Sequence, residues 1–578
     1  MPEQRERWNS RTAFVMAAIG SAVGLGNVWR FPVVCYANGG GAFLIPYLVA
    51  LLTAGIPLMI LEMGIGQMMQ GSAPKSLKKV NRHTEWVGWF ALMVALAISC
   101  YYAAIMAYSV EYLVYSFKGF ANNGQMAWMG YEGGPGKFFT EQVLQSNLDA
   151  GTMWQPVGYV WAGLVLTWVA VFFCVAWGVK AVSKIVMWTV PLPIVLLLVL
   201  IVRGITLEGA GDGIMYYLTP QFEALKNPQT WLAAYGQIFF SLTLGFGVMI
   251  AYASYQSENS DVTNNAFITC FSNCAISFIA GFAVFSVLGF LAASQGAQVQ
   301  DVVTGGPGLA FVTYPTAVAK MAEVGWFWAP VVGVLFFLML LFLGIDSLFS
   351  LVEAAVSGLK DKYAFMTQMN VTAGLCVVGL GTGVLFASRA GIMWVDIFDY
   401  WTNNYGLVIV GLLQCIVVGY FYKTDNLRAY INRVSEIKLW GWWELCIRLV
   451  TPFVLVYLIG KNLLDDLTGA GLYGIADARG TAFEGLLWVP PVVLAVIATI
   501  GMAMSRLWIY LVLIVGGLCV TGLTWFVLRT REGALPAAMF CGFAAAILIG
   551  GLLVCIDVAR RGKAHGDQDV DPDDIETV

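Results

Sequence analysis

The chain has 578 residues, of which 59% are hydrophobic and 11% charged, and its formal net charge is −4. Soluble domains carry roughly 25% charged residues, so this composition excludes a water-soluble globular protein and predicts an all-α integral membrane protein. The chain contains two histidines and none of the common catalytic motifs, so we expect neither a histidine-built metal centre nor an enzyme. We also expect no nucleic acid partner; the expected surroundings are the lipid bilayer.

Apolar stretches long enough to cross a bilayer recur along nearly the whole chain. A membrane-spanning helix needs about 20 apolar residues. We expect spans at 12–36, 41–70, 87–117, 158–178, 183–204, 231–256, 262–293, 326–358, 366–387, 392–421, 441–463, 484–504, 507–529 and 534–558. The turn at Ser505-Arg506 is very short for a connection between two spans, so we expect about 12–14 membrane helices in total.

Basic residues cluster in alternate connections between these spans. They are Arg5, Arg7 and Arg11 before the first span, then Lys75, Lys78, Lys79, Arg82, Lys180, Lys184, Lys423, Arg428, Arg433, Lys438, Arg560, Arg561 and Lys563. Cytoplasmic loops carry an excess of Lys and Arg, so the pattern predicts a cytoplasmic N-terminus. Arg529 and Arg531 fall on the other side, which weakens the assignment of the last hairpin. The expected location is a plasma (inner) membrane.

Two of the predicted spans contain residues that weaken a helix. Residues 20–32, GSAVGLGNVWRFP, interrupt the first span, and residues 237–247, QIFFSLTLGFG, interrupt the sixth. Glycine and asparagine are poor helix formers, and lipid offers no partner to the backbone groups that they free. Interrupted helices at matching positions in two halves are the best sequence indication of a transporter binding site. Close helix packing at small residues is the alternative for either segment.

These two segments also resemble a known family. Together with NGGGAFLIPY at 38–47 and LGIDSLF at 343–349 they agree in order and spacing with the neurotransmitter:sodium symporter family. The resemblance covers residues 5 to 460 and is nearest to bacterial or archaeal members that transport amino acids, such as the bacterial leucine transporter. It implies two inverted five-helix repeats with broken helices 1 and 6.

The resemblance also implies a division of the chain. The expected parts are a cytoplasmic N-terminus at 1–11, a first inverted repeat at 12–204 (helices 1–5), a second at 205–421 (helices 6–10), additional membrane helices at 422–560 and an acidic cytoplasmic tail at 561–578. Family members usually have twelve spans, and some bacterial members have eleven. The extra C-terminal hairpin has no functional explanation in the sequence.

Two sodium sites are implied by the same resemblance. The first (Na1) would use residues matching Ala22, Asn27, Ser241 and Asn273 together with the substrate carboxylate. The second (Na2) would use residues matching Gly20, Val23, Leu343, Asp346 and Ser347. Asp346 lies in the run LMLLFLGIDSLFSLV, and an ionisable residue inside a membrane span indicates a functional site. Pairing of Asp346 with another polar side chain is the alternative.

Chloride dependence is a further implication. Ser277 stands where the bacterial leucine transporter has an acidic residue and chloride-dependent animal members have serine. The chloride ligands of those members match Tyr47, Gln237, Ser241, Asn273 and Ser277. Two sodium ions and a zwitterion leave a net positive charge at mid-membrane, which needs a nearby negative charge. A bound chloride or another acid, such as Glu62, could supply it.

The expected substrate is a neutral amino acid with a hydrophobic side chain. In the family, monoamine carriers have aspartate where this chain has Gly24, so glycine leaves room for a substrate carboxylate. The resemblance places that carboxylate at the amides of Leu25 and Gly26 and the Tyr102 hydroxyl. The substrate ammonium would lie at Ala22, Phe240, Ser241 and Thr243. The side-chain pocket would be formed by Ile98, Tyr102, Phe240, Thr243, Phe246, Ser347, Leu348 and Leu351, with Leu348 expected to reduce its size.

Two gates complete the expected site. By resemblance, Arg30 and Asp399 would close the outer side, and Arg5 and Asp361 the inner side. Exposed ion pairs contribute only about 0–1 kcal/mol, which suits a contact that must open. For Arg5, an anchor that follows the positive-inside rule is the alternative.

The sequence therefore predicts a secondary active symporter that imports neutral amino acids by alternating access, coupled to two sodium ions. A sodium-coupled carrier of osmolytes such as betaine or taurine is one alternative. A sensor that binds an amino acid without transporting it is another. The sequence does not determine the exact amino acid, the ion stoichiometry or the oligomeric state.

Overall fold

The computed structural model describes residues 5–146, 155–302, 306–323 and 325–467. The predicted spans at 484–504, 507–529 and 534–558 and the predicted tail at 561–578 lie outside the described residues, as does most of the predicted additional segment 422–560. Each of the eleven predicted spans from 12–36 to 441–463 contains one helix or several consecutive helices. The expected all-α architecture is confirmed for this part of the chain.

The helices follow in this order, with short 3-10 or π segments labelled η. The first half contains α1 (Arg11–Ala22), α2 (Leu25–Ala37), η1 (Gly40–Phe43), α3 (Leu44–Ala50), η2 (Leu51–Gly55), α4 (Ile56–Met69), α5 (Ala73–Val80), α6 (Glu85–Ala121), α7 (Gly134–Lys137), η3 (Phe138–Val143), α8 (Gly158–Val175), α9 (Val179–Thr189), α10 (Pro191–Ile205) and α11 (Ala210–Leu218). The second half contains η4 (Phe222–Lys226), α12 (Pro228–Ser241), α13 (Val248–Ala253), α14 (Val262–Gln295), α15 (Val299–Val302), η5 (Leu309–Thr313), α16 (Tyr314–Lys320), η6 (Met321–Glu323), α17 (Trp328–Lys362), α18 (Gln368–Gly383), α19 (Gly391–Trp401), η7 (Thr402–Leu407), α20 (Val408–Ile416), η8 (Val417–Lys423), α21 (Thr424–Val434), α22 (Gly441–Leu445), η9 (Cys446–Val450) and α23 (Thr451–Leu467).

By length and composition, eight helical segments in the described part of the chain can cross a membrane, or nine when α1 and α2 are counted as one bent span. The long helices α6 and α14 are the most enclosed, with 78% of their most apolar window buried. The segments α9–α10 and α22–α23 have only 33% of theirs buried, so their apolar side chains face outward. This difference in burial is expected when the central helices form a site and the peripheral helices contact lipid.

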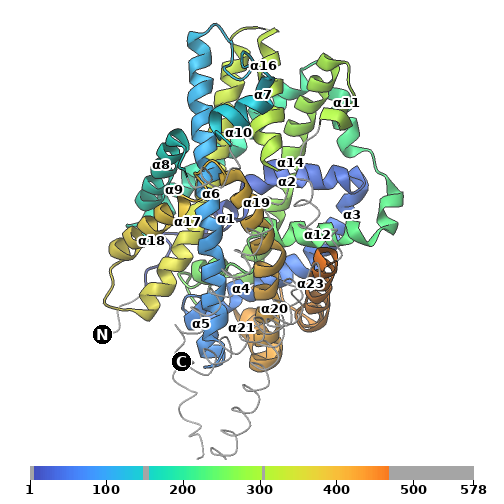
Figure 1. Cartoon of the computed structure of the whole chain (residues 1–578). Coiled ribbons are helices and arrows are strands. Elements are labelled where there is room, and N and C mark those ends of the chain that lie inside the picture. The colour runs from blue at the N-terminus through green and yellow to red at the C-terminus, as the bar shows by residue number, and fades with distance from the viewer. Residues whose placement is uncertain (1–4, 147–154, 303–305, 324, 468–578) are drawn as a thin grey trace, which may run out of the picture.

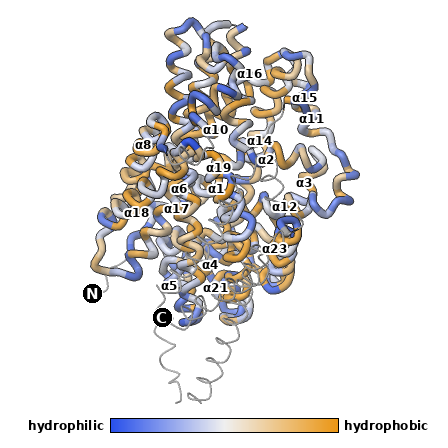
Figure 2. The backbone as a smooth tube through the Cα atoms, in the orientation of Figure 1, coloured by the Kyte–Doolittle hydropathy of each residue, from blue (hydrophilic) through white to orange (hydrophobic). Residues whose placement is uncertain are grey.

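Helix α6 runs through the height of the molecule and packs along α17, while α5 and α21 lie together at one end (Figure 1). Helices α7, α11 and α16 lie at the opposite end (Figure 1). Figure 2 shows that hydrophilic stretches concentrate in the connections at these ends, and that α8, α10 and α23 are mostly hydrophobic. The bent pair α1–α2 lies in the middle, where the chain is surrounded by other helices.

Both predicted helix interruptions are present. Between α1 and α2 the chain bends by 52°, and Val23 and Gly24 are extended there. The interruption between α12 and α13 is longer, and Thr243, Gly245 and Gly247 have φ values of +54°, +83° and +73°. Positive φ is costly for residues other than glycine, so Thr243 marks a backbone held by its surroundings.

Candidate functional site

The two interruptions border one cavity of about 310 Å³, which also contacts α6, α17 and α19. It is lined by Ser21, Ala22, Gly24, Leu25, Gly26, Asn27, Trp29, Arg30, Val33, Val34, Ile98, Tyr101, Tyr102, Ile105, Phe240, Ser241, Thr243, Phe246, Gly306, Pro307, Ser347, Leu351, Val395, Asp396 and Asp399. Its volume is near the lower limit for small-molecule sites, roughly 300–1,000 Å³. The charged residues on its wall are Arg30, Asp396 and Asp399.

The N-terminus of α2 forms one wall of this cavity. The Leu25 amide donates to the Tyr102 hydroxyl at 3.3 Å, and the Gly24 amide donates to Asn27 Oδ1 at 2.8 Å. A Cβ at Gly24 would lie 2.7 Å from Ser347 Oγ, and one at Gly26 would lie 2.5 Å from the Phe240 ring. Glycine therefore lets the backbone approach both neighbours. Amides at a helix N-terminus attract anions such as carboxylates.

The second interruption is tied to the first. The Thr243 hydroxyl donates to the carbonyl of Ser21 at 3.0 Å, which links the two broken backbones directly. Behind it, the Gly245 amide donates to Glu62 Oε1 at 2.9 Å, so a buried carboxylate from α4 supports the turn. These contacts give the freed amide and carbonyl groups the partners that a membrane interior demands.

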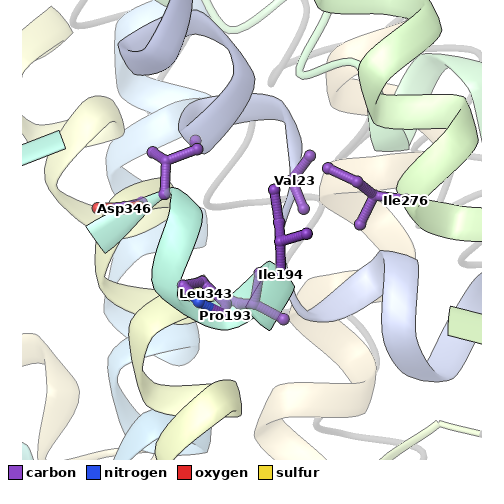
Figure 3. Close-up of a pocket in the computed structure, with 8 residues that line it drawn as sticks. Val23, Pro193, Ile194, Ile276, Leu343 and Asp346 are labelled. Atoms are coloured by element: carbon purple, nitrogen blue, oxygen red, sulfur yellow. The ribbon is translucent and has the colours of Figure 1, made fainter. Parts of the chain in front are cut away.

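A second, much smaller cavity of about 10 Å³ lies beside Asp346. It is lined by Gly20, Val23, Val190, Pro193, Ile194, Ile276, Leu343 and Asp346. Figure 3 shows the side chains of Val23, Ile194, Leu343 and Asp346 around this space. The Asp346 side chain is 2% exposed, and its Oδ1 atom has no hydrogen-bond partner among the described residues. The space is about that of one water molecule, so it fits a single small ion beside one carboxylate.

A third group of polar side chains joins α2, α12 and α14. Asn27 Nδ2 lies 2.8 Å from the Asn273 side-chain amide and 2.7 Å from Ser277 Oγ. When Asn273 turns its nitrogen toward α1, it donates to the carbonyls of Ala22 at 3.0 Å and Ser241 at 3.2 Å. A half-turn of that amide would instead gather oxygens at the same point, an arrangement that a hard cation requires. Asn27 differs from the expectation, because its oxygen faces Gly24 and its nitrogen faces this group.

Two buried donors next to this group lack a close hydrogen bond. The Gln237 side-chain amide has no hydrogen-bond partner among the described residues, and the Tyr47 hydroxyl lies beside Cys274 and Ser277 without a close hydrogen bond to either, although the two residues are only 1% and 2% exposed. Ser277, one residue of the same predicted set, is fully buried and donates to the carbonyl of Asn273 at 3.0 Å. A buried polar group without a partner costs free energy, so this corner suits a ligand that accepts hydrogen bonds.

At the end of the molecule where α5 lies, Arg5 connects several segments of the chain. Its Nη1 atom donates to both oxygens of Asp361, at 2.8 and 3.0 Å. Its other nitrogens donate to Ser254 and Ser357 at 3.0 and 2.9 Å, and the guanidinium lies 4.8 Å from the centre of the Tyr255 ring. An ion pair and two further hydrogen bonds thus hold the Arg5 side chain at this end of the molecule.

The residues predicted for the other gate, Arg30 and Asp399, are arranged differently. The Arg30 guanidinium lies over the Phe240 ring at 4.5 Å. Asp399 Oδ1 accepts hydrogen bonds from Tyr101 at 2.8 Å and from Asn403 at 2.7 Å. Both Arg30 and Asp399 line the cavity of about 310 Å³, but the contacts given above are with other side chains. The cavity therefore extends to the two residues that were predicted for the outer gate.

Most of the predicted substrate-binding residues line the larger cavity, and Leu348 does not. Leu348 is fully buried in α17, so it packs behind the wall and the expected reduction of the pocket is not supported. Ser347, predicted for Na2, lines the larger cavity and not the small one. Asp396, Gly306 and Pro307 were not predicted. Of these three, only Asp396 could have been found from the sequence, because it is a second acidic residue one helical turn before Asp399.

Comparisons with known proteins find one family and several related transporters. The family model described as "Sodium:neurotransmitter symporter family" matches residues 5–131 and 120–470. An uncharacterized sodium-dependent transporter of Methanocaldococcus jannaschii is 40% identical over 474 residues, covering 80% of this chain and 92% of that protein. A sodium- and chloride-dependent taurine transporter of Bos taurus is 34% identical over 486 residues (78% and 77% covered). The sodium- and chloride-dependent GABA transporter 2 of Homo sapiens is 32% identical over 487 residues (78% and 79% covered).

Proposed function

Since this multi-pass membrane chain belongs to the sodium:neurotransmitter symporter family, whose members are sodium-dependent transporters and not enzymes, we propose that it imports a neutral amino acid with two sodium ions. The proposed mechanism is alternating access, in which gates close the central site on each side in turn. The proposed location is the plasma membrane, with the N-terminus in the cytoplasm.

The observation that carries the substrate proposal is the distribution of charge in the larger cavity. The charged residues on its wall, Arg30, Asp396 and Asp399, come from α2 and α19, whereas the residues that line it from α6, α17 and the second interruption are uncharged. The amides of Leu25 and Gly26 would bind the substrate carboxylate, and the carbonyls near Ser241 would bind its ammonium. Apolar walls favour an uncharged, hydrophobic side chain through burial.

Sodium is the second substrate in this proposal. The carboxylate of Asp346 beside a space for one small ion supports one sodium site. The oxygens of Ala22, Ser241 and Asn273 support the other, after the half-turn of the Asn273 amide. That second group carries no charge of its own, so the substrate carboxylate would complete it. Direct contact between ion and substrate would couple the binding of one to the other.

Chloride is part of the proposal because of Tyr47 and Gln237. Their buried donors, with the Ser277 hydroxyl, could hold one anion. Sodium- and chloride-dependent relatives support the same assignment. Compensation by Glu62 is the alternative, because that carboxylate also lies near the second interruption.

The proposed orientation rests on charge. Lys75, Lys78 and Lys79 lie on α5, at the end of the molecule that also holds Arg5, and Arg428 and Arg433 lie on α21 nearby. An excess of basic residues at one end indicates the cytoplasmic side. The closed ion pair of Arg5 and Asp361 would then face the cytoplasm, and Arg30 the outside.

The test is uptake of labelled amino acids into proteoliposomes that contain the full chain. An inward sodium gradient is compared with potassium, each with chloride or gluconate outside. We expect neutral amino acids to accumulate only with the sodium gradient, and to accumulate less when gluconate replaces chloride outside. Binding without sodium-driven accumulation would favour the sensor instead.

A second candidate substrate follows from the relatives, which include taurine and GABA transporters. An osmolyte such as taurine has a wider separation between its charged groups than an α-amino acid. The same vesicles distinguish the two, since taurine uptake that unlabelled leucine or methionine does not inhibit would overturn the amino-acid proposal.

A further inference from the structure

The inner ion pair has a third member, Lys75 of α5. Its Nζ atom lies 3.2 Å from Asp361 Oδ1, the same oxygen that Arg5 Nη1 contacts at 2.8 Å. Asp361 also accepts the amide hydrogen of Ser72, the residue before α5, at 2.7 Å. Two cations therefore share one carboxylate oxygen, and a backbone amide binds the other oxygen.

These two cations belong to parts of the chain that differ in how they are attached. Arg5 lies on the short segment before α1, whose contacts with the scaffold include the bond from the Trp8 amide to the carbonyl of Tyr255 at 3.2 Å. Lys75 lies on α5, which a second buried acid attaches to α6 and α17. Glu85 of α6 accepts from Lys78 of α5 at 2.9 Å and from Lys362 of α17 at 2.6 Å.

The Glu85 carboxylate is well satisfied, with a side chain only 4% exposed. The indole nitrogen of Trp89 adds a third donor at 3.3 Å. Removal of one partner from such a buried, paired charge is costly, so α5 remains beside the end of α17 whether or not Arg5 is bound. Lys75 and Ser72 consequently remain next to Asp361 when the N-terminal segment leaves.

The like charges of Arg5 and Lys75 repel one another while both contact Asp361. The crowding of positive charge extends to Lys79, whose pKa is lowered by burial and then by the neighbouring Lys75 charge. When Arg5 leaves, this repulsion disappears and Asp361 keeps a cation. Lys75 therefore stabilises the open inner gate more than the closed one.

We propose that Lys75 is a positioning residue which competes with Arg5 for Asp361 and so favours opening of the inner gate. The inference rests on the proposed inner gate and adds a residue to it. It gives the two cations on one carboxylate opposite roles: Arg5 holds the gate closed, and Lys75 lowers the cost of opening it.

The test measures hydrogen exchange of the N-terminal segment in the full chain, reconstituted in nanodiscs. The Trp8 amide is protected by its bond to Tyr255 only while this segment is docked, so its exchange rate reports gate opening. We expect Lys75→Gln to slow this exchange roughly two- to fivefold, as estimated for a partly exposed ion interaction, and Arg5→Gln to accelerate it. In the Arg5→Gln background the effect of Lys75→Gln should vanish, because the repulsion is already absent.

Lys79→Gln is the matched control, because it removes the same charge from α5 while the Lys79 ammonium donates to the carbonyl of Met69 and not to Asp361. The Lys79 charge acts on Arg5 and Asp361 without contacting Asp361, so we expect Lys79→Gln to slow the exchange clearly less than Lys75→Gln does. Faster exchange in Lys75→Gln, or an unchanged rate, would overturn the proposal. Exchange needs no transport, so a failure of the proposed symport would appear separately, in the uptake assay.

Discussion

The two candidate sodium sites lie close to the first helix interruption and differ in their charge. The small cavity has the carboxylate of Asp346, whereas the group around Asn27, Ser241 and Asn273 consists of amides, hydroxyls and carbonyls. A site with its own carboxylate can hold a cation before any substrate arrives. A neutral site in a membrane interior needs a negative charge from a ligand. The neutral site is therefore the one at which a bound substrate or a bound anion can control the binding of sodium.

The largest expected effect comes from removing the charge that distinguishes the two sites. Asp346→Asn keeps the size of the side chain and makes both sites neutral. We expect sodium-driven uptake to fall at least about 100-fold, since loss of one partner of a buried charge pair costs roughly 3–5 kcal/mol. Uptake at a fixed sodium concentration near the half-saturation value of the unmodified chain is the measurement. The exposed Asp212 of α11 gives the matched control, Asp212→Asn, which should transport normally. Full uptake by Asp346→Asn would show that the charged site is not required.

The chain segment that joins the two sites gives the next effect. Gly24 follows Val23 of the small cavity, its amide donates to Asn27 of the neutral site, and a Cβ there would be 2.7 Å from Ser347 Oγ and 3.1 Å from the Tyr102 hydroxyl. Overpacking costs roughly 1–3 kcal/mol, so we expect Gly24→Ala to raise the KM for the amino acid about 10-fold or more. Gly236→Ala on α12, where nothing lies within 4 Å of the added carbon, is the matched control. Equal KM values in the two variants would place the substrate elsewhere.

A smaller effect tests the charge balance of the neutral site. Ser277→Glu supplies a fixed carboxylate where we place the anion, and Ser277→Gln supplies a neutral side chain of similar size. We expect the ratio of uptake in chloride to uptake in gluconate to fall from roughly fivefold or more to near one in Ser277→Glu alone. The same ratio in both variants would show that the neutral site does not depend on chloride, and would favour Glu62 as the compensating charge.

The sequence predicts the fold better than the directions of side chains. Hydropathy alone located the helices up to residue 463, because every span must be apolar along its length. Glycine and polar residues within apolar stretches located both interruptions. The orientation of Asn27 and the stacking of Arg30 on Phe240 depend on contacts between distant helices, which no local pattern records. In α17 the polar residues Asp346, Ser350 and Glu353 recur at helical spacing and mark one face, but Leu348 and Leu351 are both leucine, so the residue types did not show which of the two borders the larger cavity.

The position of Leu348 outside the lining of the larger cavity leads to the last test, which asks whether this residue influences substrate choice. Leu351 lines the larger cavity and Leu348 does not. In Leu351→Ala the added space should favour larger side chains, by roughly 1–3 kcal/mol for each methylene accommodated. In Leu348→Ala the uptake ratio of methionine to alanine should change less than about twofold, while the free energy of unfolding falls by roughly 2–5 kcal/mol. Competition uptake and thermal unfolding measure the two quantities. If Leu348→Ala changed the uptake ratio as much as Leu351→Ala does, Leu348 would contact the substrate, as predicted from the sequence. The substrate pocket would then differ from the cavity described above.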